Sequence, residues 1–199
     1  MAIFLLSPAR CDGRRSQVLM NPEATFQIAT ELRSPGGAAI GEVFSFLSGL
    51  YFRGKLAYAN AFGAGSSWVI TTNRGLVTPD ARIGPGDIAE FASVDLSKAG
   101  DSFLAPLVEH AEAIARSASP DSLVVLLGSI ATPKYVTPLE RVFGERLVFP
   151  REFVGRGDMS RGGLLLRQVT AGEELEYIPV RTAVRHGKRP PKLEPVRRR

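Results

Sequence analysis

The sequence predicts an α/β fold in which helices cover both faces of a mostly parallel central sheet, giving three layers. Short apolar runs alternate with amphipathic helical segments along the chain, which is typical of this class. The run Leu123–Leu127 is unbroken in hydrophobicity, as a central parallel strand covered on both faces should be. Of the 199 residues, 44% are hydrophobic and 23% charged, which excludes wholesale disorder and fibrous structure. We expect one domain over residues 1–184.

The first half of the chain predicts two strands and two helical segments. The apolar run Ile3–Leu6 is expected to be a buried strand, because Ser7 and Pro8 then open a polar loop. A helix is expected over Glu23–Leu32, directly after Pro22, because apolar residues recur on one face. The two remaining expected elements are a helix in the second half of Val43–Phe62 and a strand over Trp68–Thr72.

The second half begins with an amphipathic helix over Phe103–Ala118, where apolar residues recur at helical spacing. The strand Leu123–Leu127 follows it. Beyond that strand we expect a short helix over Pro138–Phe143, a strand over Leu147–Phe149, a glycine- and arginine-rich loop over Glu152–Gly163, and a late strand pair formed by Leu164–Val169 and Glu174–Val180.

The composition argues against several classes of site. One Cys excludes an intramolecular disulfide and a Cys-rich zinc site, and two widely separated His argue against a His-based metal site, so we expect no metal and no cofactor. No run approaches the roughly 20 apolar residues of a membrane span, and the N-terminus lacks a signal-peptide pattern, so we expect a cytoplasmic protein. Walker A, dinucleotide-binding and Gly-x-Ser-x-Gly motifs are absent from the sequence. Cys11 is a weak nucleophile candidate whose pKa neighbouring arginines are expected to lower.

The positive charge of the chain is concentrated at its C-terminus. Residues 185–199 hold seven of the 25 basic residues and one of the 20 acidic ones, which leaves 18 basic and 19 acidic residues in the rest. We expect this segment to be a disordered basic tail that binds nucleic acid non-specifically. A solubilising tail without a partner is the alternative.

Three polar segments follow expected strands or interrupt apolar stretches. The first, Ser7–Arg15, places the carboxylate of Asp12 among the cations Arg10, Arg14 and Arg15. It is either a solvated turn or a site where the carboxylate acts on a ligand while the arginines hold phosphates.

The second segment, Gly41–Lys55, interleaves aromatic side chains with cations. Such a pattern suits a pocket for a stacked base with a phosphate beside it, although the apolar members also fit a plain core. Its candidate site residues are Glu42, Ser48, Tyr51, Phe52, Arg53 and Lys55.

The third segment, Phe149–Gly163, holds four glycines that free the backbone for close approach. Arg156, Ser160 and Arg161 supply donors for an anion. We expect these three residues to contact nucleic-acid phosphates and to converge with Arg53 and Lys55 on one face.

Short motifs resemble known families. Leu5–Ala9 and Leu47–Tyr51 resemble signatures of the YaaA-like peroxide-stress proteins, which are associated with DNA binding. The order of motifs from Leu50 to Asp87 is similar to that of a family of small uncharacterised bacterial and phage proteins.

A more distant resemblance is to the uracil-DNA glycosylase superfamily. There a loop after an early strand bears the catalytic carboxylate or Asn, and a late apolar strand ending in Gly precedes a second, lesion-inserting loop. Asp12 and the segment Phe149–Gly163 take these places here, while the Gly-Gln-Asp-Pro-Tyr-His and His-Pro-Ser-Pro signatures are absent. The resemblance implies a uracil-DNA-glycosylase-like fold and a base-excision reaction.

These observations lead to the hypothesis of a DNA glycosylase that excises a modified base, acting in defence against phage DNA. Asp12 would be the catalytic carboxylate and Glu42 would assist by holding water or the base. The partner would be nucleic acid, with DNA preferred. Two alternatives remain open at this point: a non-catalytic YaaA-like DNA-binding stress protein, and an accessory protein of tRNA or nucleoside modification. The sequence does not fix the oligomeric state.

Overall fold

The computed structural model describes residues 2–94, 100–131, 133–185, 187–191 and 193. Its main feature is a six-stranded sheet of order β4-β3-β1-β6-β7-β8. The four central strands are parallel, and each outer strand pairs antiparallel with its neighbour. The expected α/β class with a mostly parallel sheet is thereby confirmed. The strands are β1 (Ile3–Leu6), β3 (Ser67–Ile70), β4 (Leu76–Val77), β6 (Val124–Leu127), β7 (Leu147–Pro150) and β8 (Tyr177–Pro179).

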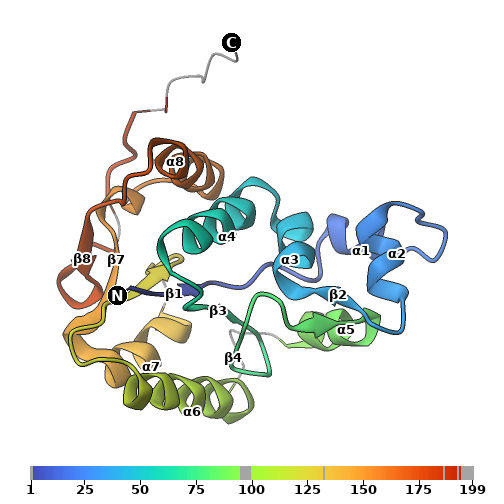
Figure 1. Ribbon diagram of the computed structural model, residues 1–199, viewed down its shortest axis with the longest axis horizontal. Helices are drawn as coiled ribbons and strands as arrows, with labels where there is room; N and C mark the ends of the chain where they lie inside the picture. The colour runs from blue at the N-terminus through green and yellow to red at the C-terminus, as the bar shows by residue number, and fades with distance from the viewer. Residues whose placement is uncertain (1, 95–99, 132, 186, 192, 194–199) are drawn as a thin grey trace.

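Helices cover both faces of this sheet, as Figure 1 shows. One face is covered by α4 (Leu50–Phe62) and α8 (Asp158–Ala171), the other by α6 (Asp101–Ser117) and α7 (Pro133–Phe143). A smaller group of elements extends from one end of these layers. It comprises α1 (Arg14–Met20), α2 (Gln27–Arg33), α3 (Ile40–Ser48), α5 (Pro85–Ser93) and the two-stranded antiparallel sheet of β2 (Ala38–Ala39) with β5 (Arg82–Ile83). Three 3-10 turns complete the described chain: Gly144–Arg146, Arg151–Phe153 and Val180–Thr182.

The centre of the sheet is formed by β1 and β6, and all eight of their residues are buried. The two strands pair in parallel from Ile3 opposite Val124 to Leu6 opposite Leu127. Neighbouring strands and a helix layer on each face explain why both runs are continuously apolar. The expectation that the 123–127 run is a central parallel strand is confirmed.

The packing of α4 on α8 depends on two glycines at their crossing point. A Cβ on Gly162 would lie 2.5 Å from the carbonyl oxygen of Leu50, and a Cβ on Gly54 would lie 2.7 Å from the carbonyl oxygen of Gly162. The two backbones therefore approach more closely than any side chain would allow. Gly162 serves this helix contact and not the approach of a phosphate that its sequence context suggested.

The structure overturns two expected elements near the C-terminus. The predicted loop over 152–163 is a 3-10 turn, a short connection and the first turns of α8. The predicted strand over Leu164–Val169 is the middle of α8, which ends at Gly172 in the left-handed conformation, with φ of 71°. Six residues are too few to distinguish the two periodicities, and packing on α4 selects the helix. The late strand β8 pairs with β7 instead.

The other expected elements occur with shifted bounds. The segment 43–62 forms the end of α3 and all of α4, which are separated by Gly49 at a φ of 62°. The helix expected over 138–143 begins earlier, at Pro133. The helix expected over 23–32 begins at Gln27 and ends at Arg33. Within the described part of the chain, no helix combines the length and apolar character that a membrane span requires.

Candidate functional site

The strand order places a crevice at the carboxyl ends of β1 and β6. From β1 the chain passes to β3 on one side, and it later enters the sheet again at β6 on the other side of β1. Ligands of open α/β sheets bind at such a reversal, beyond the carboxyl ends of the strands. Here the loop beginning at Ser7 lies beside the loop beginning at Gly128, and the Ser7 amide donates to the Leu127 carbonyl at 3.2 Å.

A cleft of about 640 Å³ opens at this edge of the sheet. Its size falls in the range of small-molecule sites. The loop after β1, the segment that follows β3, the end of α5 and the start of α7 form its walls. The lining residues are Pro8, Ala9, Arg10, Cys11, Asp12, Thr72, Phe91, Ala92, Ser93, Val94 and Lys134.

Asp12 is the carboxylate of this cleft, and its side chain is 52% exposed. Arg10 donates to it twice, from Nε at 2.5 Å and from a terminal nitrogen at 3.1 Å. These bonds hold the pKa of Asp12 below its usual value, so the carboxylate is ionised at neutral pH. Asp12 is thus an exposed, ion-paired carboxylate.

Cys11 lies next to Asp12 but does not form a reactive thiolate. Its side chain is buried, and burial raises the pKa of its thiol to about 12, with a smaller contribution from the charge of Asp12. The lowering expected from the neighbouring arginines is therefore wrong, because Arg10 is turned towards Asp12 and desolvation prevails.

A buried lysine lies beneath the loop that carries Asp12. Lys55 of α4 is 1% exposed, and its Nζ donates to the Ser7 carbonyl at 2.6 Å and to the Ser7 hydroxyl at 3.0 Å. The rings of Tyr51 and Phe52 lie 4.5 Å from Nζ. Burial lowers the pKa of Lys55 to about 7, and the attraction of Asp158 opposes this only in part.

Ser7 connects Lys55 to the loop after β6. The Tyr135 hydroxyl lies beside Ser7 at Gly128, and it donates to the Ser129 carbonyl at 3.1 Å. A Cβ on Gly128 would lie 2.9 Å from the Ser7 Cβ and 3.1 Å from the Tyr135 hydroxyl, so only glycine fits there. Lys55, Ser7 and Tyr135 together join the two loops that border the crevice. Sequence analysis missed Tyr135, because no local pattern distinguishes it from a core tyrosine.

The two aromatic residues expected to stack on a base are buried. Phe52 is fully buried and packs edge-on against Phe44, with ring centres 5.4 Å apart. Tyr51 is 5% exposed, and its hydroxyl has no hydrogen-bond partner among the described residues. Burial raises the pKa of this hydroxyl. Neither ring presents a face to a ligand, so the expected stacking role is wrong, and the core alternative is correct.

The polar residues expected beside those aromatics point in different directions. Arg53 is exposed, whereas Lys55, two positions later on the same helix, is buried and faces Ser7. The expected convergence of Arg53 and Lys55 on a phosphate does not occur. Ser48 is the half-buried last residue of α3. Glu42 is exposed in the first turn of α3 and lines a different hollow, together with Phe26 and Glu31, so the expected assistance to Asp12 is not supported by its position.

The two arginines that begin α1 differ in role. Arg14 is exposed. Arg15 donates to the Phe46 carbonyl at 2.9 Å and lies over Gly49, where a Cβ would be 2.5 Å from its guanidinium. Its charge thus lies at the C-terminal end of α3, where a cation is favourable. This contact gives Arg15 a structural role in addition to the expected one.

Arg156 and Arg161 do converge, on a second hollow of about 460 Å³. This hollow is lined by Ala131, Gly155, Arg156, Gly157, Arg161, Arg185, Gly187 and Arg189. The Ser160 hydroxyl is uncharged, and it accepts a hydrogen bond from Arg156 at 3.3 Å. Ala131 is three positions from Lys134 of the cleft, so their Cα atoms lie within about 11 Å of each other. The cleft and the arginine-lined hollow therefore flank the same connection between β6 and α7.

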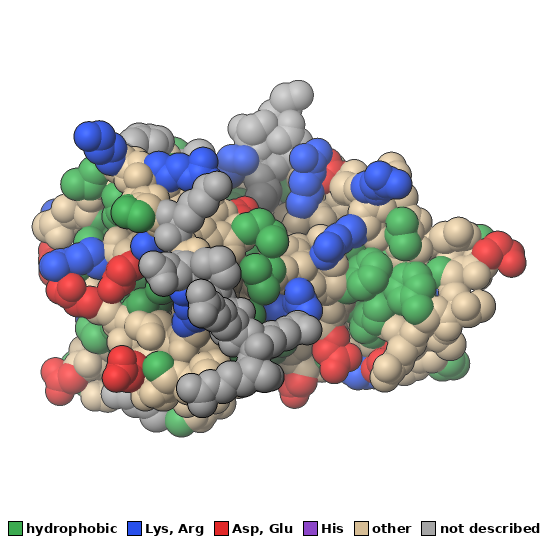
Figure 2. Space-filling model, turned by 90° about the horizontal axis from the view of Figure 1, so that it is seen from above, with side chains coloured by type: hydrophobic (Ala, Val, Ile, Leu, Met, Phe, Trp, Pro, Cys, Tyr) green, Lys and Arg blue, Asp and Glu red, His purple; other side chains and the backbone are tan. Residues whose placement is uncertain are grey.

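Basic and acidic side chains are unevenly distributed on one face of the molecule (Figure 2). Figure 2, which looks onto the face of the molecule covered by α3, α4 and α8, shows Lys and Arg side chains gathered toward its upper edge. Most of the Asp and Glu side chains visible there lie toward the lower edge. Within the described residues, no group of three or more His, Cys, Asp or Glu residues could hold a metal ion.

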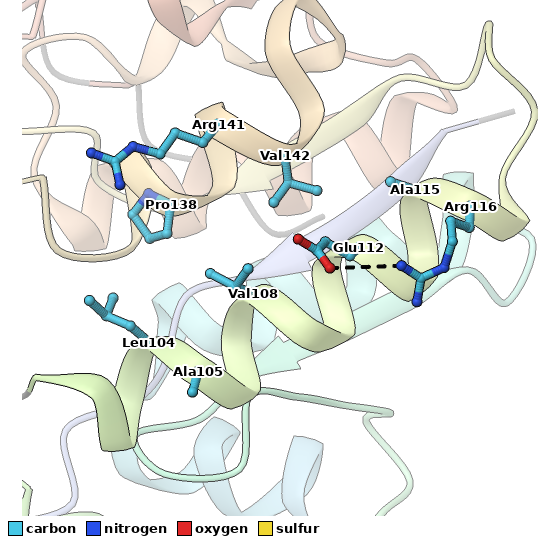
Figure 3. Close-up of a pocket in the computed structure, with 9 residues that line it drawn as sticks. All are labelled: Leu104, Ala105, Val108, Glu112, Ala115, Arg116, Pro138, Arg141 and Val142. Carbon is cyan, nitrogen blue, oxygen red and sulfur yellow. Dashed lines mark ion pairs between the residues drawn. The ribbon is translucent and has the colours of Figure 1, made fainter.

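A larger hollow, of about 780 Å³, lies between α6 and α7 and is shown in Figure 3. Its lining is mostly apolar, with an ion pair of 3.7 Å between Glu112 and Arg116. All of its lining residues belong to the two helices and none to the strand-end loops. It is therefore separate from the crevice.

Comparisons with protein-family models, with curated proteins and with solved structures found no match to this chain.

Proposed function

We propose that this protein is a DNA glycosylase that removes a modified base and leaves an abasic site. The observation that carries the proposal is the ionised carboxylate of Asp12 on the wall of a cleft at the strand-order reversal. Arg10 and Lys134 border the same cleft, and the arginine-lined hollow lies beside it. A base pocket with a carboxylate and flanking cations is what excision of an everted base requires.

In the proposed reaction, the target nucleotide leaves the base stack and its base enters the cleft. The bond between C1′ and the base nitrogen breaks, its electron pair goes to the base, and the base takes up a proton. Asp12 stabilises the positive charge that develops on the sugar, and water then adds to C1′ and loses a proton. Phe91, Ala92 and Val94 supply apolar wall for the base.

Arg10 would exchange its partner when DNA binds. Its side chain is 80% exposed, and an ion pair at such a surface is screened by solvent and contributes little to stability. A DNA phosphate can therefore replace Asp12 as the partner of Arg10 at little cost. This exchange would leave the carboxylate facing the sugar.

The proposal includes the likeness to the uracil-DNA glycosylase superfamily. The parallel order β3-β1-β6-β7 and the position of Asp12 after β1 support it. The second, lesion-inserting loop is supported less, because α8 begins at Asp158 inside the segment expected to form it. The biological role that we propose is defence against phage DNA carrying modified bases.

The test is incubation with duplexes that carry modified or unmodified bases, followed by alkali, which cleaves DNA at abasic sites. Asp12→Asn should lower excision by about a hundredfold or more while DNA binding persists. Glu42→Gln is the matched control, because it neutralises an exposed carboxylate that lies outside the cleft, and we expect it to retain activity.

Two outcomes would contradict the proposal. Full activity of Asp12→Asn would show that Asp12 is not the catalytic carboxylate. Binding without abasic sites on any modified duplex would favour a non-catalytic DNA-binding protein. In that case, the same binding assay with tRNA distinguishes the DNA-binding alternative from an RNA-modification accessory.

A further inference from the structure

We infer that the N-terminus of α8 and the side chains of Arg156, Arg161, Arg185 and Arg189 together form a binding site for a phosphomonoester, the dianionic phosphate at the end of a nucleic acid or of a free nucleotide. The inference concerns the arginine-lined hollow alone and holds whether or not the neighbouring cleft excises a base.

The backbone of this hollow is suited to an anion. Gly157 is the N-cap of α8, and no side chain caps this end of the helix. A Cβ on Gly157 would meet no atom within 4 Å, so the space beside this residue is open. Unpaired amides and the helix dipole favour an anion at this position.

The C-terminal segment closes one side of the hollow. A Cβ on Gly155, which has a φ of 72°, would meet the Lys188 carbonyl, and one on Gly187 would meet the Val154 side chain. Pro191 accepts a hydrogen bond from Arg156 at 3.3 Å. Arg185 and Arg189 lie in the wall of the same hollow as Gly157 at the start of α8.

The guanidinium of Arg161 is already fixed in position for an incoming anion. It donates to the Phe153 carbonyl at 3.2 and 3.1 Å and lies over the Phe153 ring, and its side chain is 13% exposed. The buried Nε of Arg156 has no hydrogen-bond partner among the described residues. The Nη1 of Arg156 donates to the Ser160 hydroxyl and to the Pro191 carbonyl, both at 3.3 Å, so this guanidinium is also held in place at the hollow.

The charge of the hollow matches a dianion. Four arginines line it, and two carboxylates lie near them: Asp158 at 3.7 Å from Arg161 and Glu140 at 3.9 Å from Arg185. The excess is two positive charges. A terminal phosphate carries about −1.5 to −2 at pH 7, whereas each internal phosphate of a nucleic acid carries −1. The charge balance thus favours a terminal phosphate over an internal one.

The binding test uses single-stranded 12-mers of one sequence with a 5′-phosphate, a 3′-phosphate, or hydroxyls at both ends, followed by fluorescence anisotropy. We expect one phosphorylated end to tighten binding at least tenfold over the hydroxyl-ended strand. Arg185→Gln and Arg189→Gln, both at exposed positions, should remove this preference while leaving binding of the hydroxyl-ended strand within about threefold. Arg116→Gln is the charge-matched control, because Arg116 lies on α6, outside the hollow, and it should keep the preference.

Competition by a nucleoside monophosphate distinguishes the two sources of the phosphate. If the mononucleotide displaces the phosphorylated 12-mer at a similar concentration, a free nucleotide is sufficient as the ligand of this site. If it does not, the ligand is the phosphorylated end of a nucleic acid. The inference is overturned if no 12-mer with a terminal phosphate binds more tightly than the hydroxyl-ended one. It is also overturned if the two arginine variants weaken all 12-mers equally, since that would show only general attraction to the nucleic-acid backbone. Base excision is not measured in either assay, so this result and that for Asp12 are independent.

Discussion

Because Lys55 is buried, the free energy of unfolding of the wild-type protein should rise with pH above neutrality. Replacing Lys55 with Met should abolish this rise. The pKa of Lys55 is lowered from 10.5 to about 7 by burial, and the side chain is 1% exposed, so solvent does not screen the effect. At 1.36 kcal/mol per pKa unit, keeping the ammonium charged in the folded protein costs about 5 kcal/mol.

The direction follows from proton binding. Between pH 7 and 10.5 the unfolded chain binds the proton more often than the folded chain, so the free energy of unfolding rises with pH. The cost is fully present below about pH 7, decreases as the pH rises, and disappears above about 10.5. Between pH 7 and pH 9 the cost of the buried ammonium falls by about 2 kcal/mol, and the free energy of unfolding rises by the same amount. This corresponds to a rise in Tm of about 4–8 °C for a chain of this length.

Thermal unfolding of the wild type and Lys55→Met from pH 6 to pH 9.5 checks this expectation. The difference between the two profiles removes the titration of all other groups, and it should change by about 2 kcal/mol between pH 7 and 9. The hydrogen bonds lost to Ser7 shift the whole Met profile by about 1–3 kcal/mol but do not create a slope. Lys134→Met, at an exposed position, should keep the wild-type slope. Parallel profiles for the wild type and Lys55→Met would refute the reasoning.

Two further predictions concern packing and reactivity. Gly162→Ala should lower the free energy of unfolding, measured by urea denaturation, by about 1–3 kcal/mol, because the added Cβ would overlap the Leu50 backbone. Gly163→Ala is the control: its Cβ would meet only Leu193, at 3.5 Å, and it should raise the free energy of unfolding by about 0.5–1 kcal/mol. Equal effects of the two variants would contradict the close crossing of α4 and α8. Cys11, with a pKa of about 12, should resist iodoacetamide at pH 7.5 in the folded protein and react once urea unfolds it, and rapid labelling of the folded state would show that its burial is overstated.

The central strands could be predicted because their signal is local. Ile3–Leu6, Val124–Leu127 and Leu147–Pro150 are continuous apolar runs, and continuous burial on both faces is what the parallel sheet imposes on them. The middle of α8 could not be predicted in the same way. Leu164–Val169 is apolar and short, and its helical state depends on a contact with α4, a helix that is distant in the sequence.

The burial of Lys55 did have a signal in the sequence. Residues 51, 52, 55, 58 and 59 recur at intervals of three and four and form one face of α4, and all of them are buried. Lys55 lies on this face and Arg53 does not. Reading the helix phase would have separated the two cations that were expected to converge. Tyr135 and the arginines of segment 185–189 required the fold itself, since they reach the crevice and its neighbouring hollow from distant parts of the chain.

The position of Lys55 also bears on how the crevice is built. A folded chain that carries a buried ammonium at a cost of about 5 kcal/mol would gain stability from an apolar residue of similar size, so stability alone does not account for a lysine here. What the lysine adds is a pair of hydrogen bonds to Ser7, at the end of β1, and through Ser7 a connection to Tyr135 and the loop after β6. These contacts fix the start of the loop that carries Asp12, five residues after Ser7. Strongly shifted pKa values cluster where side chains must be held for function, and this one lies directly behind the cleft of the proposed reaction.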